Sequence, residues 1–435
     1  MLGLFLYFYF MKIDALHTLF LDCNAVSTDT RKVDYNNMFF ALSGDNFNGN
    51  TFAEDALKKG AKYAIIDDVN FKTSDNTILV ENTLKTLQQL ARYHREYLGI
   101  KIISLTGSNG KTTTKELINA VLSQKYNTTA TIGNFNNHIG VPLTLLSMTK
   151  DTEIGIVEMG ANHKKEIEFL CQIAKPDFGY ITNFGKAHLE GFGSTAGVIE
   201  GKSELYTYLT SNNNSIFINA DDAIQFEKLN SYVKKIGFSQ NNSTDFNIKL
   251  VEANPFVSFT TEDTLIKSNL IGEYNFTNLC AATSIGKYFD VDLTKIKDAI
   301  EAYTPTNNRS QIINKASNTI ILDAYNANPS SMDVALQNFG NQTNKNKIAI
   351  LGDMFELGPS ASKEHQTIVN LTNTLDIDHV ILIGENFYKT QINGSKTKQY
   401  KSFEDFKTNY TSIKDCFVLI KGSRGMALER ILDLL

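Results

Sequence analysis

The sequence has little cysteine, no strong excess of either charge, and no internal repeat or low-complexity segment. Its four cysteines, Cys23, Cys171, Cys280 and Cys416, lie far apart and form no CxxC pair. This spacing suits reduced thiols and gives no zinc site, so a reducing cytoplasm fits best. The formal net charge is -5. Because there is no overall basic field, we expect no nucleic acid partner, although a local basic pocket for phosphates is compatible with this charge.

An apolar run, MLGLFLYFYF, occupies residues 1–10. It is too short to span a bilayer, it lacks a basic n-region, and no small-residue cleavage site follows it. We therefore expect no stable membrane insertion. Because Met11 opens an ordinary amphipathic segment, we hypothesise that Met11 is the natural initiator. N-terminal sequencing of natural protein that begins at Met1 would refute this.

The length of 435 residues exceeds what one hydrophobic core usually supports, so we expect about three domains. Hydrophobic residues make up 42% of the chain, charged residues 20% and aromatic residues 11%. These values are ordinary for a globular protein and give no case for disorder. The hinges between domains must be short. The segment YTPTNNR at residues 303–309 is the best hinge candidate, because proline and asparagine favour turns.

Hydrophobic periodicity predicts an α/β fold throughout. A small α/β domain over residues 11–100 has β-like runs at 37–42, 61–67 and 77–80 and helical runs at 51–59 and 84–97. A central domain over residues 101–308, with a mainly parallel sheet, has strands at 101–106, 153–159, 178–182 and 215–219 and a helix at 113–126. A third α/β domain over residues 309–435 has strands at 320–323, 347–351, 379–383 and 416–421.

The strongest chemical signal is TGSNGKTTTKE at residues 106–116, between a predicted strand and a predicted helix. Backbone N–H groups and the helix dipole favour anions at such a junction. Gly107 and Gly110 would let the backbone approach phosphate oxygens, Lys111 would neutralise β and γ charge, and the Thr112 hydroxyl would bind magnesium. The general P-loop has glycine where Leu105 stands, so this loop is a shorter variant. An ordinary capped helix start is the alternative, but the order of strand, loop and helix favours a nucleoside triphosphate.

This segment resembles the shortened ATP loop of the Mur ligase family, and three further matches follow in order. They are GNFNNHIGVPLTLL at 133–146, EMGANHKKEI at 158–167 and ITNFGKAHLEGFGS at 181–194. Other segments resemble the branch of the family that joins D-alanyl-D-alanine to a UDP-linked muramoyl tripeptide. They are LDAYNANPSSM at 322–332, LGDMFELG at 351–358, KGSRGMALE at 421–429 and the nucleotide-sugar segment at 39–61.

The resemblance runs from about Met11 to the C-terminus and implies a cytoplasmic, ATP-dependent amide ligase. It implies an N-terminal domain that binds the UDP moiety, a central P-loop-type ATPase domain and a C-terminal Rossmann-like domain that closes over the site. ATP would phosphorylate a carboxylate of UDP-MurNAc-tripeptide, and the amine of D-alanyl-D-alanine would attack the acyl phosphate. Two magnesium ions would assist. We expect the enzyme to act as a monomer.

The resemblance also implies residue roles. ATP would be bound by Gly107, Ser108, Asn109, Gly110, Lys111, Thr112, Thr113, Asn275, Asn278, Arg309, Asp323 and Asn326. Magnesium would be held by Thr112, Glu158, His188 and Lys202, the last of these as a carbamate. Catalysis would use Lys111, Lys202 and His188, with Asn137 and His138 lining the active site. Substrates would be bound by Ser27, Thr28, Asp29, Thr30, Arg31, Asn328, Lys421 and Arg424. Tyr274 stands where the family commonly has histidine.

Taken without the resemblance, these residues have simpler interpretations. A strand-end glutamate such as Glu158 is commonly solvated, and an isolated histidine such as His188 more often forms a local hydrogen bond. Lys202 would ordinarily be a solvated helix residue, and a C-terminal basic pair such as Lys421 and Arg424 is normally exposed. Asparagines cluster in turns, as at residues 134–138, because they tolerate the left-handed conformation.

Three other functions compete with this interpretation. The first is another ligase of the same fold, such as a folylpolyglutamate synthase or a different Mur ligase, which would differ in the acceptor amine. The second is a P-loop NTPase switch or motor, and the third is a binding module without catalysis. The segments at 322–332 and 351–358 favour the D-alanyl-D-alanine ligase. The sequence leaves open whether the third residue of the tripeptide is diaminopimelate or lysine.

Overall fold

The structure is a computed structural model in which residues 11–241 and 245–435 are described. The apolar run at residues 1–10, and with it the hypothesis about the natural initiator, lies outside the described residues. The chain forms two compact units, one made of Met1–Ser104, Tyr126–Gly160 and Glu168–Phe178, and the other of Leu105–Lys125, Ala161–Ile167 and Gly179–Leu435. No helix in the described part of the chain is long and apolar enough to cross a membrane.

The first unit begins with a four-stranded parallel sheet of order β1-β2-β3-β4. Its strands are β1 (Val26–Ser27), β2 (Met38–Phe40), β3 (Tyr63–Ile66) and β4 (Thr77–Leu79), and its helices are α1 (Ile13–Leu21), α2 (Ala53–Lys58) and α3 (Thr83–Leu98). The Asn82 side chain caps α3 by accepting from the Lys85 N–H, and Gly99 ends the helix in the left-handed conformation. These two residues define the long helix that the periodicity predicted.

A seven-stranded sheet has the order β11-β10-β9-β8-β5-β7-β6. Its strands are β5 (Lys101–Thr106), β6 (Thr128–Ala130), β7 (Ile154–Glu158), β8 (Phe178–Ile181), β9 (Ser215–Asn219), β10 (Lys235–Ser239) and β11 (Phe246–Asn247). The helices of this part of the chain are α4 (Lys111–Leu122), α5 (Gly140–Leu146), α6 (Glu166–Ala174), α7 (Leu189–Phe192), α8 (Thr195–Ser211), α9 (Ala223–Lys228), α10 (Phe276–Tyr288) and α11 (Leu293–Ala302). Helix α4 packs against α10. This contact places two buried asparagines behind the loop that precedes α4: Asn275, just before α10, and Asn278, within it.

A three-stranded antiparallel sheet follows, made of β12 (Lys249–Glu252), β13 (Phe256–Thr261) and β14 (Thr264–Ile271). The hairpin between β13 and β14 turns at Glu262 and Asp263, whose φ angles are both positive. Positive φ at both central residues is typical of a type I′ turn, whose twist suits a two-residue hairpin. The sequence interpretation did not foresee this sheet.

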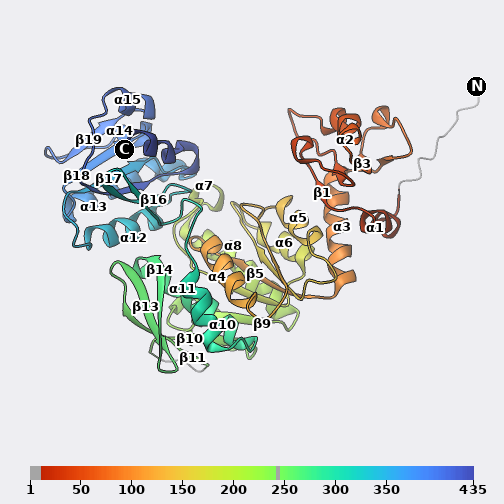
Figure 1. The fold of residues 1–435 in the computed structure, drawn as a ribbon, viewed down its shortest axis with the longest axis horizontal. Helices are drawn as coiled ribbons and strands as arrows, with labels where there is room; N and C mark the ends of the chain where they lie inside the picture. Colours follow the sequence, from red (N-terminus) through yellow and green to blue (C-terminus); the bar gives the residue numbers. More distant parts are fainter. Residues whose placement is uncertain (1–10, 242–244) are drawn as a thin grey trace, which may run out of the picture. The chain divides into compact units, whose positions relative to one another are not determined.

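The C-terminal part of the second unit, coloured teal to blue in Figure 1, contains a six-stranded sheet. Its order is β15-β16-β20-β17-β18-β19, and only β15 is antiparallel. Its strands are β15 (Gln311–Lys315), β16 (Asn318–Asp323), β17 (Lys347–Gly352), β18 (His379–Ile383), β19 (Thr397–Tyr400) and β20 (Phe417–Lys421), and its helices are α12 (Pro329–Gly340), α13 (Ala361–Thr374), α14 (Glu385–Tyr388) and α15 (Phe403–Thr408). Ile321 packs with residues of α12 and α13, whereas its neighbour Ile320 packs with residues of α15. Because neighbouring strand residues point to opposite faces, the sheet carries a hydrophobic core on each side.

The expected α/β class with mainly parallel sheets is confirmed, and each predicted strand overlaps an observed one. Most differences are at element ends: the run predicted at 37–42 is a strand only at Met38–Phe40, and the helix predicted at 113–126 is Lys111–Leu122. Strands β1, β6, β10, β11, β15 and β19 were also not expected. Each lies at a sheet edge except β10, which is next to the edge strand β11, and none has a long apolar run.

A buried pair of histidines connects α1 to α3 in the first unit. His17 Nε2 lies 3.0 Å from His94 Nδ1, and His94 Nε2 lies 2.9 Å from the Met148 carbonyl oxygen. A carbonyl oxygen only accepts, so His94 carries its proton on Nε2 and accepts from His17 through Nδ1. Burial and the neighbouring His94 lower the pKa of His17 from 6.5 to about 4, and burial lowers the pKa of His94. The pair is therefore neutral at pH 7.

This pair predicts an acid-sensitive stability. Because the folded-state pKa of His17 lies below its unfolded value, its contribution is complete above about pH 6.5 and is lost as the pH falls toward 4. We expect His17→Gln, whose amide can still donate to His94, to reduce the loss of unfolding free energy between pH 7 and pH 5 by about 2 kcal/mol at most. Urea unfolding at both pH values checks this. Equal losses in the variant and the natural protein would contradict it.

Candidate functional site

The loop of residues 107–110 joins β5 to α4 and is shaped by two glycines. Gly107 has φ +144° and Gly110, the residue before the helix, has φ +78°. Both values lie in the region that favours glycine. A Cβ atom on Gly107 would lie 1.9 Å from Thr182 Oγ1, and one on Gly110 would lie 2.5 Å from Asn278 Oδ1. The two glycines thus allow side chains behind the loop to approach its backbone, and their predicted role toward phosphate oxygens stays a prediction.

Residues 182–185 hold the loop in place from behind. Thr182 Oγ1 donates to the Asn109 carbonyl oxygen at 2.5 Å, and the Asn109 N–H donates to Asn183 Oδ1 at 3.1 Å. Asn183 Nδ2 returns a hydrogen bond to the Asn109 carbonyl at 3.1 Å, and Ser108 Oγ donates to the Gly185 carbonyl at 2.7 Å. These four hydrogen bonds therefore give the loop one defined backbone conformation. Sequence reasoning assigned no role to Thr182 or Asn183, although their segment carried the family resemblance.

A chain of buried side chains supports the loop at its helix end. Thr114 Oγ1 donates to Asn278 Oδ1 at 3.0 Å, Asn278 Nδ2 donates to Asn275 Oδ1 at 2.9 Å, and Asn275 Nδ2 donates to the Ile271 carbonyl at 2.9 Å. Asn275 and Asn278 are each 4% exposed. The structure thus brings both predicted asparagines to the phosphate loop, where they hold Gly110 and α4 in position.

The Lys111 amine lies over the loop. Its Nζ donates to the carbonyl oxygens of Gly107 at 2.7 Å and Ser108 at 3.3 Å. Thr112 and Thr113 begin α4 and are buried. A cation, a helix N-terminus and a glycine loop at one place form an anion site that suits the phosphates of a nucleotide.

Glu158, at the end of β7 in the first unit, is not a solvated residue: it is 1% exposed. Asn136 Nδ2 donates to its Oε1 at 2.8 Å, while its Oε2 is buried without a hydrogen-bond partner. A buried carboxylate oxygen without a partner is costly, and Mg²⁺ binds such hard oxygens. The simpler interpretation of this residue is wrong, and its geometry fits a metal ligand.

The neighbouring loop residues have structural roles. Asn137 Oδ1 accepts from the N–H groups of Ile139 at 3.1 Å and Gly140 at 2.9 Å, so it caps the start of α5. The His138 carbonyl accepts from Gln88 Nε2 at 3.0 Å, and its side chain is exposed. The proposed lining role of these two residues stays a prediction.

Lys202 of α8 is fully buried, which overturns its interpretation as a solvated helix residue. Its Nζ donates to the Ala161 carbonyl at 3.1 Å and lies 5.2 Å from the centre of the Phe192 ring. Burial, followed by the positive charge of Lys111, lowers its pKa well below the usual value. This environment disfavours the protonated form of the amine, and an unprotonated amine is a nucleophile.

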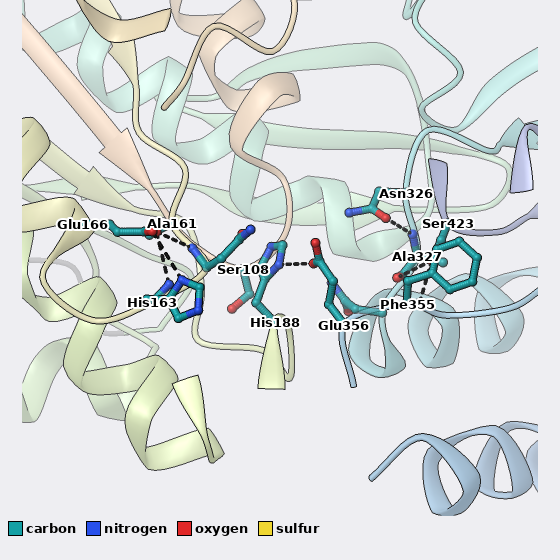
Figure 2. Close-up of polar contacts among 12 residues, drawn as sticks. Ser108, Ala161, His163, Glu166, His188, Asn326, Ala327, Phe355, Glu356 and Ser423 are labelled. Atoms are coloured by element: carbon teal, nitrogen blue, oxygen red, sulfur yellow. Dashed lines mark hydrogen bonds and ion pairs between the residues drawn. The ribbon is translucent and has the colours of Figure 1, made fainter. Parts of the chain in front are cut away.

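His188 precedes α7 and bonds through Nδ1 to the Glu356 carboxylate (Figure 2). This hydrogen bond holds the pKa of Glu356 below its usual value. The backbone of both residues is left-handed, with φ +52° at His188 and +60° at Glu356. Such conformations in residues other than glycine persist where the surroundings enforce them.

Asp323 and Lys421 end the neighbouring strands β16 and β20 and form an ion pair at 2.5 Å. Asp323 Oδ1 also accepts from the Ser310 N–H at 3.2 Å. Lys421 is 2% exposed, so the interpretation of Lys421 as an exposed basic residue is wrong. Arg424 is exposed and pairs with Glu429 at 2.8 Å. The lysine's charge is already matched within the protein.

Other predicted residues of the second unit surround the segment after β16. The Arg309 guanidinium lies 3.8 Å from the centre of the Tyr325 ring. Asn326 Oδ1 accepts from the Ala327 N–H at 2.9 Å. Asn328 caps α12 by accepting from the Ser331 N–H, and its Nδ2 donates to Asn109 Oδ1 of the phosphate loop at 2.7 Å. Asn328, predicted to bind substrate, thus contacts the phosphate loop directly.

Tyr274 and the expected hinge are tied to their surroundings. Tyr274 Oη lies 2.8 Å from Ser310 Oγ, and burial raises its pKa. At the hinge, Tyr303 Oη donates to Glu116 Oε2 at 2.5 Å, and Asn307 Nδ2 donates to Glu116 Oε1 at 3.0 Å. Because Glu116 lies on α4, the beginning of the hinge segment is attached to the helix that carries the phosphate loop.

The predicted uridine-diphosphate segment of the first unit is held by local hydrogen bonds. Ser27 Oγ donates to the Asp29 carbonyl at 2.9 Å, and Arg31 pairs with Asp29 at 2.8 Å. The Arg31 hydrogen bonds lower the pKa of Asp29 to about 2. Thr28 and Thr30 are half-buried in the same turn. Arg31 is exposed, so a pyrophosphate would have to compete with Asp29 for its guanidinium.

In the described residues, no three His, Cys, Asp or Glu side chains lie together as a metal-binding group. A magnesium site would therefore need other oxygen donors, such as the Thr112 hydroxyl and the phosphates of a nucleotide. Magnesium is usually bound in this way, through one or two carboxylates together with substrate phosphates and water.

Comparison with known proteins gives consistent matches along the chain. Family models match residues 22–95 ("Mur ligase family, catalytic domain"), 105–286 ("Mur ligase middle domain") and 308–424 ("Mur ligase, glutamate ligase domain"). The UDP-N-acetylmuramoyl-tripeptide–D-alanyl-D-alanine ligase of Bacillus subtilis (strain 168) is 35% identical over 94% of this chain and 92% of that protein.

Solved structures give the same result. MurF from Acinetobacter baumannii has a TM-score of 0.82 and 29% identity, covering 94% of this chain and 92% of that one. The MurF ligase from Thermotoga maritima in complex with ADP has a TM-score of 0.81 and 27% identity, covering 95% and 97%. The similarity therefore extends over nearly the whole chain in both sequence and fold.

The packing of Gly110 against Asn278 predicts the result of adding one methyl group. We expect Gly110→Ala to lower the free energy of unfolding by about 2 kcal/mol or more, from left-handed strain of roughly 1 kcal/mol and the displacement of Asn278. Gly133→Ala is the control, because Gly133 also has a positive φ but has open space where the Cβ would lie. It should lose only about 1 kcal/mol. Urea unfolding measures both variants, and equal losses would contradict the role of Asn278.

Proposed function

Because the chain belongs to the Mur ligase family, we propose that it is an ATP-dependent amide ligase that joins D-alanyl-D-alanine to UDP-N-acetylmuramoyl-tripeptide. The product would be the UDP-MurNAc-pentapeptide, a precursor of peptidoglycan. The observation that carries this proposal is the near-full-length similarity to the Bacillus subtilis enzyme of that name. The preformed phosphate loop supports ATP as the nucleotide, as does the ADP bound by the Thermotoga maritima relative.

The proposed reaction has two steps. The tripeptide carboxylate attacks the γ-phosphorus of ATP, so that an acyl phosphate forms and ADP leaves. The free amine of D-alanyl-D-alanine then attacks the acyl carbon, loses a proton, and expels phosphate from the tetrahedral intermediate. A triphosphate and a carboxylate a few ångströms apart repel by several kcal/mol at an effective dielectric of about 20. Lys111, whose amine lies over the phosphate loop, supplies part of the charge that opposes this repulsion.

We propose that magnesium is held by the Thr112 hydroxyl, Glu158, His188 and a carbamylated Lys202. The metal supplies charge neutralisation on the phosphates. The unpartnered Glu158 Oε2 and the buried, low-pKa Lys202 amine support this choice of ligands. The amine would attack carbon dioxide and lose a proton, which converts a buried lysine into a carboxylate-like ligand.

The remaining assignments follow the family resemblance. Residues 11–100 would bind the UDP moiety through the segment of Ser27 to Arg31, residues 101–308 would bind ATP, and residues 309–435 would close over the site. Arg309, Asp323 and Asn326 would contact ATP, while Asn328, Lys421 and Arg424 would contact substrate. We propose a monomer that acts in the cytoplasm, where the four free cysteines would stay reduced.

Phosphate release tests the function. The assay contains ATP, magnesium and a UDP-muramoyl tripeptide that bears either diaminopimelate or lysine. Each tripeptide is tested with and without D-alanyl-D-alanine, and the mass of the product is determined by mass spectrometry. Release that needs both substrates and yields the pentapeptide supports the proposal and identifies the third residue. Release without either substrate would instead favour a simple NTPase, and a different acceptor amine would favour another ligase of the same fold.

Lys111 is expected to be essential for turnover. Loss of one preorganised cationic group costs about 3 to 4 kcal/mol by analogy with oxyanion donors, so Lys111→Ala should lower turnover at least about a hundredfold. Lys407→Ala, which removes an exposed lysine of α15, is the control and should keep full turnover. Turnover of Lys111→Ala close to that of the natural protein would remove the lysine from the mechanism.

Lys202 offers a separate test of carbamylation. Lys202→Ala should lose at least about a hundredfold in turnover, and short carboxylic acids such as formate or acetate should restore part of it by replacing the carbamate. The same acids should not restore Lys111→Ala, which lacks a cation rather than a carboxylate. Absence of rescue in a folded Lys202→Ala protein would count against the carbamate.

A further inference from the structure

His188 is held by a residue that no sequence argument singled out. Its Nδ1 bonds to the carboxylate of Glu356, which lies in the loop after β17 (Figure 2). The Glu356 backbone is attached to the same place, because its carbonyl oxygen accepts from the Glu190 N–H at 3.1 Å. Side chain and backbone of Glu356 therefore both contact residues 188–190.

The contact is larger than one hydrogen bond. Leu189, between the two anchored residues, packs against the hydrophobic cluster that contains Met354 and Leu357. Three consecutive residues, 188 to 190, thus rest on the loop that carries Glu356. An isolated surface pair would be worth little and would leave the imidazole free to rotate. Here the contacts of Leu189 and Glu190 hold the backbone next to His188, and the carboxylate holds its ring.

Hydrogen bonds also attach the Glu356 loop to two other segments. The N–H of Phe355 donates to Ser423 Oγ at 2.9 Å, and Ser423 Oγ donates to the Ala327 carbonyl at 3.3 Å (Figure 2). Ala327 lies next to Asn326, and Ser423 lies next to Arg424, which are residues proposed for ATP and substrate. The position of the Glu356 carboxylate therefore depends on segments that would contact both ligands.

The chemistry of a histidine–carboxylate pair is specific. A carboxylate that accepts the Nδ1–H proton fixes the tautomer in which Nε2 carries the lone pair. Outer carboxylates orient metal-binding histidines in this way, and their loss typically costs 10- to 100-fold in metal affinity. We propose that Glu356 is a positioning residue that holds the His188 ring with Nε2 directed to the magnesium of the ligase reaction. This inference rests on the proposed function, since it takes His188 as a metal ligand.

The experiment measures metal binding rather than turnover. Full-length protein is titrated with Mn²⁺ in the presence of a non-hydrolysable ATP analogue, and bound Mn²⁺ is followed by electron paramagnetic resonance. Nitrogen modulation in the pulsed spectrum reports whether an imidazole is bound to the metal. We expect Glu356→Ala to lower Mn²⁺ affinity at least about tenfold and to weaken the nitrogen signal. Glu356→Gln should stay close to the natural protein, because its amide oxygen can still accept from Nδ1.

Matched variants separate positioning from general damage. Glu190→Gln removes an exposed carboxylate two residues from His188 and should leave Mn²⁺ affinity unchanged. His188→Ala should remove the nitrogen signal, and Glu356→Ala should cost nothing further in that background. If Glu356→Ala does not fold, Glu356→Ser, whose side chain is too short to reach the ring, takes its place.

Two results would overturn the proposal. One is unchanged Mn²⁺ affinity and nitrogen signal in the folded Glu356 variant, and the other is additive losses for Glu356→Ala and His188→Ala. Neither measurement requires an acceptor peptide. Both results are therefore independent of whether the phosphate-release assay yields the pentapeptide. A positioning role can therefore fail while the ligase function stands.

Discussion

Phosphate binding by a loop requires backbone N–H groups that already point at the anion. In this chain residues 107–110 are held in one backbone conformation from two sides. Thr182 and Asn183 hold the middle of the loop, and Asn278 holds its helix end. These hydrogen bonds give the loop one defined backbone conformation, and a loop held in one conformation loses less conformational entropy when it binds a ligand. The arrangement of β8 beside β5 is what brings the two segments together.

The segment that supports the loop continues into the contacts with the C-terminal part of the second unit. Gly185 accepts from Ser108, the Lys186 N–H donates to Ser330 Oγ at 2.7 Å, and His188 bonds to Glu356. A single stretch of about six residues thus contacts the phosphate loop at one end and the residues after β16 and β17 at the other. Substitutions in this stretch would disturb nucleotide binding and C-terminal packing together.

The sequence was sufficient for the overall class and for placing the glycine-containing loop between a strand and a helix, because glycine, lysine and threonine at fixed spacing have a direct physical meaning. It was not sufficient for burial. Lys202 and Lys421 look like solvated residues in their segments, yet both are buried, since burial of a long side chain depends on distant neighbours. Glu356 carried no signal of its own, because one carboxylate in a loop has no periodicity or spacing.

The hairpin between β13 and β14 was missed for a different, local reason. Both central residues of the turn between β13 and β14 have positive φ, and the usual residues there are asparagine and glycine. This chain has Glu262 and Asp263 instead, so the composition gives no hairpin signal. Thr182 and Asn183 lie in the segment at 181–194 that carried the family resemblance, but the sequence did not reveal that their side chains hold the backbone of the phosphate loop. The hydrogen bonds of Thr182 and Asn183 are tertiary contacts, which a sequence pattern does not reveal.

The contact between Gly110 and Asn278 also limits how this protein can evolve. Any side chain at position 110 meets the Asn278 amide, and any change at position 278 removes the partner of Thr114 and Asn275. Residues that share partners in this way do not have independent effects on stability. A substitution at one of these positions is therefore tolerated only with a compensating substitution at another. We expect these positions to vary together across a lineage rather than singly.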